Sequence, residues 1–344
     1  MRGVAHAIAP ILLALTLLCP VSSTAAPLTY ADLPGWEQDD QAAALHAFIA
    51  SCPALAEKPD WAAACDAAPH QTDARAFFEH YFRPVPVPTR GPTLFTGYYE
   101  PELHASPVRT ARFAYPIYRK PPELNPGQVW YDRATIEGQG LLAGRGLELA
   151  WLADPVDVFF LQVQGSGRLV MPDGHVMRVG FAAKNNRPYR SIGRELADRG
   201  VFPAAQISAR TIRNWIHANP ADGRALMWTN PSYVFFRPVS LDPALGPIGG
   251  MAVPVTPGRS LAVDPRHVPL GAPVWIDTEG NQPMKRLMVA QDVGSAIKGP
   301  ERADVFVGSG FRAGEVAGSM RDTGRMFVLM PVSGLTLANA DARE

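Results

Sequence analysis

The hydrophobic pattern of the first part of the chain is helical. After Asp39 and Asp40, which are suitable helix-capping residues, apolar side chains recur on one face over residues 41–52. The same spacing over residues 73–82 predicts a second helix. The proline cluster at 84–88 then ends this helix, because proline removes a backbone donor.

From residue 94 onward, short β-branched and aromatic runs predict strands. In the middle of the chain these runs occupy residues 94–99, 113–118, 156–164, 169–171 and 176–181. Asp173-Gly174 between the last two runs is a hairpin signal. Two helices are then predicted over residues 190–199 and 209–218.

After Pro238 the predicted elements are all strands, over residues 251–255, 260–263, 273–276, 286–290, 304–307 and 326–330. Several short strands at close spacing favour a small barrel. We find no internal repeat, and the tail beyond residue 335 is predicted to be frayed.

Length and composition fit a folded protein with two domains. The chain has 344 residues, of which 47% are hydrophobic and 19% charged, so a packed core is expected. Basic and acidic residues balance at 32 each. Nucleic acid is therefore excluded as the main partner, because phosphate binding needs an excess of Lys and Arg.

The first 25 residues have the features of a secretory signal peptide. Met1-Arg2 is basic, residues 8–18 form an apolar run, and residues 23–25 are small. Cys19 raises the alternative of a lipoprotein, but a lipid-modified cysteine needs a small residue before it, and Leu18 is large. Membrane contact is expected only if Cys19 is lipidated.

Two cysteines remain after removal of the signal peptide. An exported protein enters an oxidising compartment, so Cys52 and Cys65 are predicted to form a disulfide. A loop this short stabilises the fold by about 3 kcal/mol in the chain-entropy model. Two buried thiols are the alternative.

Metal and nucleotide chemistry lack a sequence signature. The eight histidines are scattered, and neither His-Glu-x-x-His nor Cys-x-x-Cys spacing occurs. The glycine patterns at 138–143 and 308–313 fit only a loosened dinucleotide motif. There is no phosphate-binding loop and no Gly-x-Ser-x-Gly elbow. We expect neither metal nor cofactor.

Carboxylates are the stronger candidates for chemistry. Asp264, Asp292 and Asp304 each lie at the edge of a short β-branched run, beside Gly or Pro. Aspartates in such places are often only turn formers, but the glycines around the last two would let a ligand approach the backbone. Lys298 and Arg302 supply cations that set carboxylate pKa values or bind polar substrate groups. The pattern suggests proton transfer.

Aromatic and amide side chains supply a second set of candidates. Amides and aromatic rings together suit sugars, which offer hydroxyl groups and apolar ring faces. The alternative for residues 162–164 is the polar face of an alternating strand. The candidate binding residues are Thr96, Gly97, Tyr98, Tyr99, Gln162, Gln164, Gly165, Ser166, Asn185, Asn186 and Tyr189.

Several longer motifs resemble a known family. Residues 95–100 (FTGYYE), 160–167 (FLQVQGSG), 185–193 (NNRPYRSIG) and 230–236 (NPSYVFF), with the aspartate blocks, are similar to the membrane-bound lytic transglycosylase A family. The aspartate blocks look like its three-aspartate domain. The resemblance covers nearly the whole mature chain.

This resemblance implies a mainly β fold with some α-helix. A double-psi β-barrel domain would be formed by residues 26–103, including the N-terminal helices, and 240–335. A second β-rich domain, residues 104–239, would be inserted, with a groove between the two; residues 336–344 would be a flexible tail. The implied location is the periplasm, with outer-membrane association left open.

The resemblance also implies the reaction. The enzymes of this family cleave the β-1,4 bond between N-acetylmuramic acid and N-acetylglucosamine in peptidoglycan and leave a 1,6-anhydro sugar. Their catalytic aspartate corresponds to Asp304, a supporting aspartate to Asp292 and the remaining one to Asp264. Peptidoglycan is the expected partner, and a complex with other cell-wall enzymes is left open.

One carboxyl group is sufficient for such a reaction. A glycosidase usually needs two carboxylates, but here the C6 hydroxyl of the sugar is the nucleophile, so one Asp serves as acid and then as base. Burial or a nearby like charge would raise its pKa, and Lys298 and Arg302 would lower it. The alternatives are a hydrolase that positions water with Asp292 or Glu100, and a non-catalytic glycan-binding module.

Overall fold

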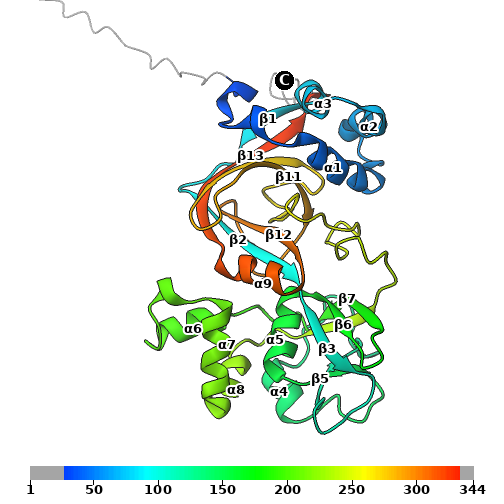
Figure 1. Ribbon diagram of the computed structural model, residues 1–344, viewed down its shortest axis with the longest axis vertical. Coiled ribbons are helices and arrows are strands. Elements are labelled where there is room, and N and C mark those ends of the chain that lie inside the picture. The colour runs from blue at the N-terminus through cyan, green and yellow to red at the C-terminus, as the bar shows by residue number, and fades with distance from the viewer. Residues whose placement is uncertain (1–26, 334–344) are drawn as a thin grey trace, which may run out of the picture.

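The computed structural model describes residues 27–333 as two lobes joined by a narrow waist (Figure 1). The predicted signal peptide, Cys19 and the predicted tail at 336–344 lie outside the described residues. No helix in the described part is long and apolar enough to cross a membrane.

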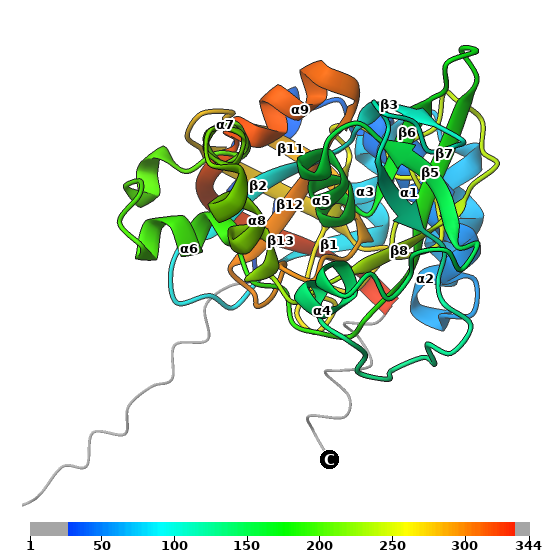
Figure 2. The same cartoon turned by 90° about the horizontal axis from the view of Figure 1, so that it is seen from below.

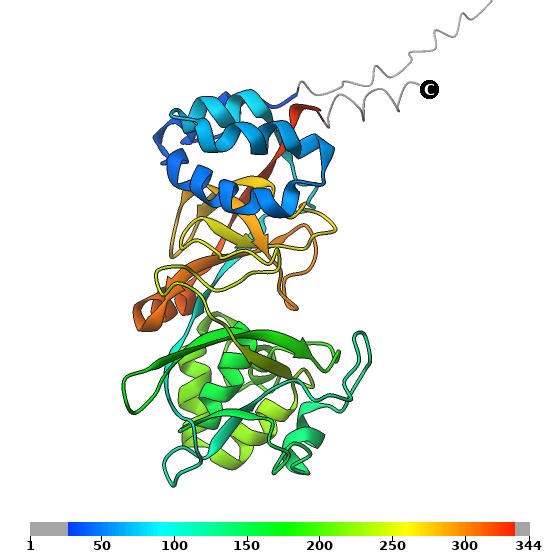
Figure 3. The same ribbon diagram turned by 90° about the vertical axis from the view of Figure 1, so that its right-hand side faces the viewer.

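Three α-helices at the N-terminus cover one side of the upper lobe (Figure 3). They are α1 (Gln41–Leu55), α2 (Pro59–Ala67) and α3 (Ala74–Tyr81), with short 3-10 helices η1 (Tyr30–Asp32), η2 (Trp36–Gln38) and η3 (Ala68–His70). Asp40 and Asp73 cap α1 and α3 by accepting hydrogen bonds from backbone amides. A disulfide between Cys52 and Cys65, with Cα atoms 5.3 Å apart, joins α1 to α2.

A closed six-stranded barrel forms the centre of the upper lobe. Its hydrogen-bonded order is β13-β10-β11-β9-β12-β2, and pairing of β13 with β2 closes the ring. The pairs β2–β12 and β9–β11 are parallel. The strands are β2 (Thr93–Glu100), β9 (Ser260–Ala262), β10 (Pro273–Glu279), β11 (Lys285–Asp292), β12 (Arg302–Ser309) and β13 (Arg321–Pro331).

The barrel lobe also contains β1 (Phe82–Pro86) and α9 (Gly310–Ser319). Strand β1 runs through the proline cluster and pairs with β13 alone, as an edge strand does. Buried apolar side chains from α1, α2, α3 and the barrel strands form one continuous core. We call β1, β2, β9–β13, α1–α3 and α9 the barrel lobe.

The second lobe is a six-stranded sheet with helices packed beside it (Figure 2). Its strands are β3 (Glu102–Ser106), β4 (Tyr115–Tyr118), β5 (Glu148–Leu152), β6 (Ser166–Val170), β7 (Val176–Lys184) and β8 (Val234–Pro238). Its helices are α4 (Arg133–Gly138), α5 (Pro155–Gln164), α6 (Ile192–Asp198), α7 (Ala209–Ala218) and α8 (Pro220–Trp228), with a 3-10 helix η4 (Ala204–Gln206). The chain crosses between the lobes twice, at Pro101 and in the segment after β8 (Figure 3).

The strand predicted over residues 156–164 is wrong, because this segment is helix α5. Asp154 caps it by accepting a hydrogen bond from the amide of Val156 at 2.8 Å, and Pro155 occupies its first turn. Gly165 ends it in a left-handed conformation with φ of 79°. A short, mainly apolar segment does not distinguish a buried strand from a buried helix, whereas the two capping signals do.

A second predicted strand, over residues 251–255, is also wrong. This segment is irregular apart from an isolated bridge between Ile248 and Pro254. The hairpin predicted at Asp173-Gly174 is confirmed, because β6 and β7 pair antiparallel around it. The helix predicted over residues 209–218 is confirmed as α7.

Candidate active site

Four neighbouring barrel strands bring two of the predicted aspartates into one row. Asp292 of β11 pairs with Ala262 of β9, Ala262 pairs with Asp304 of β12, and Asp304 pairs with Thr96 of β2. Paired residues on neighbouring strands project from the same face of a sheet. The small side chain of Ala262 therefore lies between the two carboxylates in this row.

Asp304 is held through one of its oxygens. The Thr96 hydroxyl donates a hydrogen bond to Oδ1 of Asp304 at 2.7 Å, and Nη2 of Arg302 donates to the same hydroxyl at 3.0 Å. Nη1 of Arg302 donates to the carbonyl of Leu94 at 3.0 Å, which fixes the guanidinium against β2. The arginine thus acts on the carboxylate through the threonine, and no hydrogen bond within residues 27–333 engages Oδ2 of Asp304.

The surroundings of Asp304 favour its protonated form. Burial raises the pKa of this carboxyl to about 6, and the charge of Asp292 acts in the same direction. The hydrogen bond from Thr96 and the positive charge of Arg302 oppose this shift. A substantial fraction of Asp304 is therefore protonated in mildly acidic solution, as a general acid requires.

Asp292 is fixed by backbone amides. Its Oδ1 accepts hydrogen bonds from the amides of Gly250 at 2.7 Å and Val293 at 2.8 Å, and burial raises its pKa. A Cβ at Gly249 would lie 2.7 Å from the carbonyl oxygen of Gln291. The glycine pair is needed for the returning chain to approach the carboxylate this closely.

Two tyrosines flank the carboxylates. The Tyr98 hydroxyl is buried without a partner at hydrogen-bonding geometry, but it is close enough to Asp292 and Asp304 for their charges to raise its pKa further above 10. Tyr189, from the second lobe, also has a raised pKa, chiefly through burial and partly through the charge of Asp304. Both lobes therefore contribute to the surroundings of Asp304.

Asp264 has a separate set of hydrogen-bond partners. Arg266 binds its carboxylate through two nitrogens, at 3.0 and 2.6 Å, and the amide of Gly299 donates to it at 2.8 Å. These donors hold the pKa of Asp264 well below its usual range. Asp264 thus anchors the turn that leads into β12, and it remains ionised where a general acid would be protonated.

The predicted amides are largely occupied by contacts within the protein. Oε1 of Gln162 accepts a hydrogen bond from the buried Arg133 at 2.5 Å, and Oε1 of Gln164 accepts one from the amide of Tyr99 at 3.0 Å. Asn185 is fully buried and donates to the carbonyls of Tyr131 and Pro231. These contacts occupy the oxygens of Gln162 and Gln164 and the amide nitrogen of Asn185, and so leave few groups for a sugar.

The remaining predicted residues have varied surroundings. Gly97 is required for packing, since a Cβ there would lie 2.7 Å from the Cα of Ala317 in α9. Asn186 has a φ of 56° and donates to the carbonyl of Gln128 at 2.7 Å. Ser166 is buried at the start of β6, and Lys298 is exposed.

Sequence reasoning missed three contributors to the site. Gly249 and Gly250 form a glycine pair in the returning segment, which was a usable signal. Arg133 is buried between the rings of Phe159 and Tyr233 and fixes Gln162. Nothing in the local sequence distinguishes it from a surface arginine.

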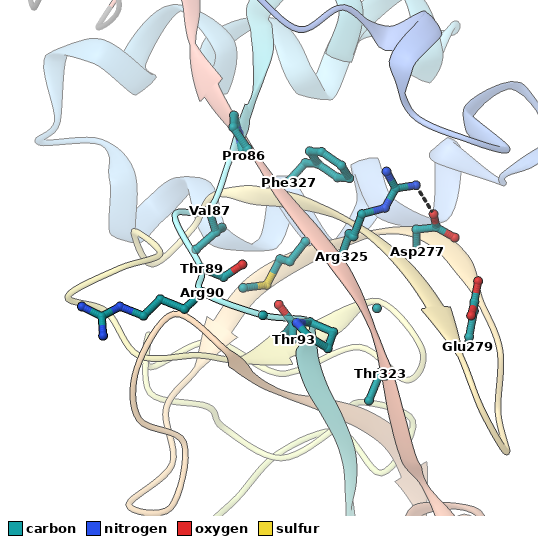
Figure 4. A pocket seen from close by; sticks show the side chains of 14 residues that line it. Pro86, Val87, Thr89, Arg90, Thr93, Asp277, Glu279, Thr323, Arg325 and Phe327 are labelled. Atoms are coloured by element: carbon teal, nitrogen blue, oxygen red, sulfur yellow. Dashed lines mark hydrogen bonds and ion pairs between the residues drawn. The ribbon is translucent and has the colours of Figure 1, made fainter. Parts of the chain in front are cut away.

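A hollow of about 680 Å³ lies elsewhere on the barrel lobe, beside the β1–β2 connection (Figure 4). Arg325 and Asp277 form an ion pair across part of it at 2.8 Å. None of the predicted site residues lines this hollow. Within residues 27–333, no group of three His, Cys, Asp or Glu could hold a metal ion.

Two family models match the chain. The "MltA specific insert domain" matches residues 94–237, and the "3D domain" matches residues 259–330. Membrane-bound lytic murein transglycosylase A of Escherichia coli K12 is 39% identical over 254 residues, covering 71% of this chain and 67% of the relative. The protein of the same name from Vibrio cholerae is 35% identical over 250 residues, covering 70% and 66%.

Solved structures are similar over most of the chain. The membrane-bound lytic murein transglycosylase from Agrobacterium tumefaciens has a TM-score of 0.81 at 36% identity, covering 89% of this chain and 97% of that one. E. coli MltA with bound chitohexaose has a TM-score of 0.70 at 32% identity, covering 87% and 90%.

Proposed function

Because the chain belongs to the family of membrane-bound lytic murein transglycosylase A, we propose that it is a lytic transglycosylase that cleaves the glycan strands of peptidoglycan. Identity of 39% to a relative of that name and a TM-score of 0.81 to a solved member support this proposal. The observation that carries it is the geometry of the half-buried Asp304 carboxyl group, which Thr96 holds through one oxygen while burial raises its pKa to about 6.

Asp304 is the single acid and base of the reaction. Its Oδ2 proton passes to the glycosidic oxygen as the bond from that oxygen to C1 of N-acetylmuramic acid breaks. The C6 hydroxyl of the same sugar then attacks C1, and its proton returns to the Asp304 carboxylate. The products are an N-acetylglucosamine end with a free hydroxyl and a 1,6-anhydro end, with no water consumed.

The neighbours of Asp304 have separate tasks. Thr96 holds Oδ1, so Oδ2 is the oxygen left to exchange the proton. Asp292 contributes a negative charge that keeps the acid protonated and that stabilises positive charge developing at C1. Its two backbone hydrogen bonds keep it in place while it does so.

The glycan is proposed to lie between the lobes, where Tyr98 of the barrel lobe and Tyr189 of the second lobe are both close enough to Asp304 for its charge to raise their pKa values. Tyrosine rings suit the apolar faces of sugars. The E. coli relative solved with bound chitohexaose supports an oligosaccharide ligand. Residues 162–166 and 185–186 would line this space mainly through backbone and packing.

Export to the periplasm is part of the proposal. The relatives are named membrane-bound, and the disulfide fits an oxidising compartment. Attachment to the outer membrane would depend on Cys19, and partnership with other cell-wall enzymes is equally a proposal.

Of the two residues that could position water in the alternative hydrolase mechanism, Asp292 and Glu100, the second is unsuitable. Glu100 is fully buried and bound by two arginines, so it cannot position a water molecule beside Asp304. Asp292 is the remaining candidate for that role.

Product analysis tests the proposal. Purified peptidoglycan is incubated with the protein, and the glycan ends are analysed by mass spectrometry. We expect 1,6-anhydro ends with wild type and none with Asp304→Asn. Reducing ends, which carry one more water, would identify a hydrolase, and bound but uncut glycan would identify a binding module.

A further inference from the structure

A buried ion cluster lies at the first crossing between the lobes. Glu100 is the last residue of β2, and its side chain is 0% exposed. Arg178 binds the carboxylate through Nε at 2.6 Å and Nη2 at 2.8 Å, and Arg168 through Nε at 2.9 Å. The hydroxyl of Ser309, at the end of β12, donates to Oε2 at 2.8 Å.

The same two arginines also hold the second crossing. Nη2 of Arg168 donates to the carbonyl of Pro243 at 2.9 Å. Arg178 donates through Nη2 to the carbonyl of Leu245 at 2.6 Å and through Nη1 to that of Asp242 at 3.2 Å. One cluster therefore joins the outgoing strand β2, the returning segment, and strands β6 and β7 inside the second-lobe sheet.

Stability alone does not account for this arrangement. A buried ion pair often contributes no more than apolar side chains of similar volume would, because both charges lose their hydration. Its directional hydrogen bonds, in contrast, permit a single geometry. The cluster combines two arginines from β6 and β7 with groups from the two barrel strands β2 and β12, so the geometry it fixes is that between the lobes.

The barrel part of the cluster lies on the same two strands as Asp304. Glu100 pairs with Ser309 on the parallel strands β2 and β12, and Thr96 pairs with Asp304 on the same two strands. In the second lobe, β7 runs from Arg178 to its end at Lys184, and the segment that follows contains Tyr189. A rotation at the cluster would therefore change how Tyr189 faces Asp304.

We propose that Glu100, Arg168 and Arg178 form an interdomain latch that sets the angle between the lobes, and that they are positioning residues for cleavage at Asp304. The part that concerns cleavage depends on the proposed function. The part that concerns geometry does not. Other hydrogen bonds also cross the interface. The amide of Tyr99, next to Glu100, donates to Gln164 at 3.0 Å, whereas Lys184 with Ser295 and Arg321 with the carbonyl of Ala204, both at 3.3 Å, are exposed contacts.

The test measures geometry and rate separately. Spin labels on Glu37→Cys in the barrel lobe and Asp222→Cys in the second lobe report the interlobe distance by pulsed electron resonance. Both native cysteines within residues 27–333 form the disulfide, so they do not take the label. Glu100→Gln keeps the shape but removes the charge, and we expect a broader distance distribution and at least a tenfold lower kcat/KM for glycan release.

Glu102→Gln is the matched control, because Glu102 is an exposed carboxylate two residues away, and it should change neither quantity. If Glu100→Gln does not accumulate, Arg168→Gln replaces it, since the Arg168 side chain is 20% exposed and less costly to change. If a folded Glu100→Gln or Arg168→Gln variant has the same interlobe distance distribution and kcat/KM as wild type, the latch proposal is wrong. Absence of anhydro products from wild type would instead contradict the proposed function and leave the distance measurement valid.

Discussion

Thr96 and Asp304 face each other on the parallel strands β2 and β12, and the threonine hydroxyl donates to Oδ1 of the carboxyl group at 2.7 Å. The same hydroxyl accepts from Arg302 at 3.0 Å. Its proton is therefore directed at the aspartate, and the orientation of the Asp304 carboxyl group depends on a neutral side chain three strands away from Asp292.

Removal of the Thr96 hydroxyl should slow the reaction and shift its pH dependence. In Thr96→Val, the lost hydrogen bond no longer lowers the pKa of Asp304, so the alkaline limb of the rate profile should move to higher pH. A hydrogen bond to a charged group contributes about 1.5–3 kcal/mol, which corresponds to roughly a ten- to hundredfold loss in kcat. Thr96→Ser retains the hydroxyl and should stay close to wild type in both measurements; an equal loss in the serine variant would argue against the hydrogen bond.

The rate of wild-type protein should decrease as the pH rises above about 6. Asp304 has a raised pKa of about 6, so its protonated form dominates below that value and decreases tenfold per pH unit above it. The measurement is kcat/KM for release of anhydro products from about pH 4.5 to about pH 8.5. This range begins near the ordinary pKa of a carboxyl group and extends well above the raised pKa of Asp304. A flat profile across pH 6 to 8 would remove Asp304 from the role of acid.

Asp304 should also lower the stability of the protein at neutral pH. Its folded pKa is raised above the usual 3.8, so the folded state binds the proton more tightly than the unfolded state. The associated stability is fully present below pH 3.8 and is lost as the pH rises through about 6. Asp304→Asn removes this dependence, and urea unfolding should show the variant to be more stable by up to about 3 kcal/mol at pH 8. The two proteins should converge near pH 3.5; a variant less stable than wild type at pH 8 would contradict the buried-acid interpretation.

The sequence predicted the family, the barrel and the importance of Asp292 and Asp304, because long motifs and strand-end aspartates are local features. It failed at residues 156–164, where an apolar run fits a strand as well as a helix. The residue pattern alone could not rank the three aspartates, and only the family resemblance singled out Asp304, since their difference lies in partners distant along the chain. Gly250 is 42 residues from Asp292, and Gly299 is 35 residues from Asp264. The interdomain role of Glu100 was equally hidden, because its arginine partners lie 68 and 78 residues away.

Asp264 should prove structural when it is changed. Its carboxylate holds Arg266 and the amide of Gly299, and its pKa is lowered, so it stabilises the fold above its ordinary pKa of 3.8 and loses this effect as the pH falls below it. Asp264→Asn should lower the thermal midpoint at pH 7 and leave the alkaline limb of the rate profile where it is in wild type. Arg266 is 70% exposed, so the loss should be modest. A displaced limb would mean that Asp264 takes part in the proton transfer.

Asp292 should act on Asp304 in the direction opposite to Thr96. Its charge contributes to the raised pKa of Asp304, whereas the Thr96 hydrogen bond lowers it. Asp292→Asn keeps an oxygen that can accept from the amides of Gly250 and Val293, so the local backbone should be retained. The alkaline limb should then move to lower pH, while in Thr96→Val it moves to higher pH, and the double variant should lie between the two. The measurement is the pH profile of the rate for Thr96→Val, Asp292→Asn and the double variant, each compared with wild type on one glycan preparation. Shifts of the same sign in both single variants would mean that they alter the fold around Asp304 and not its charge environment.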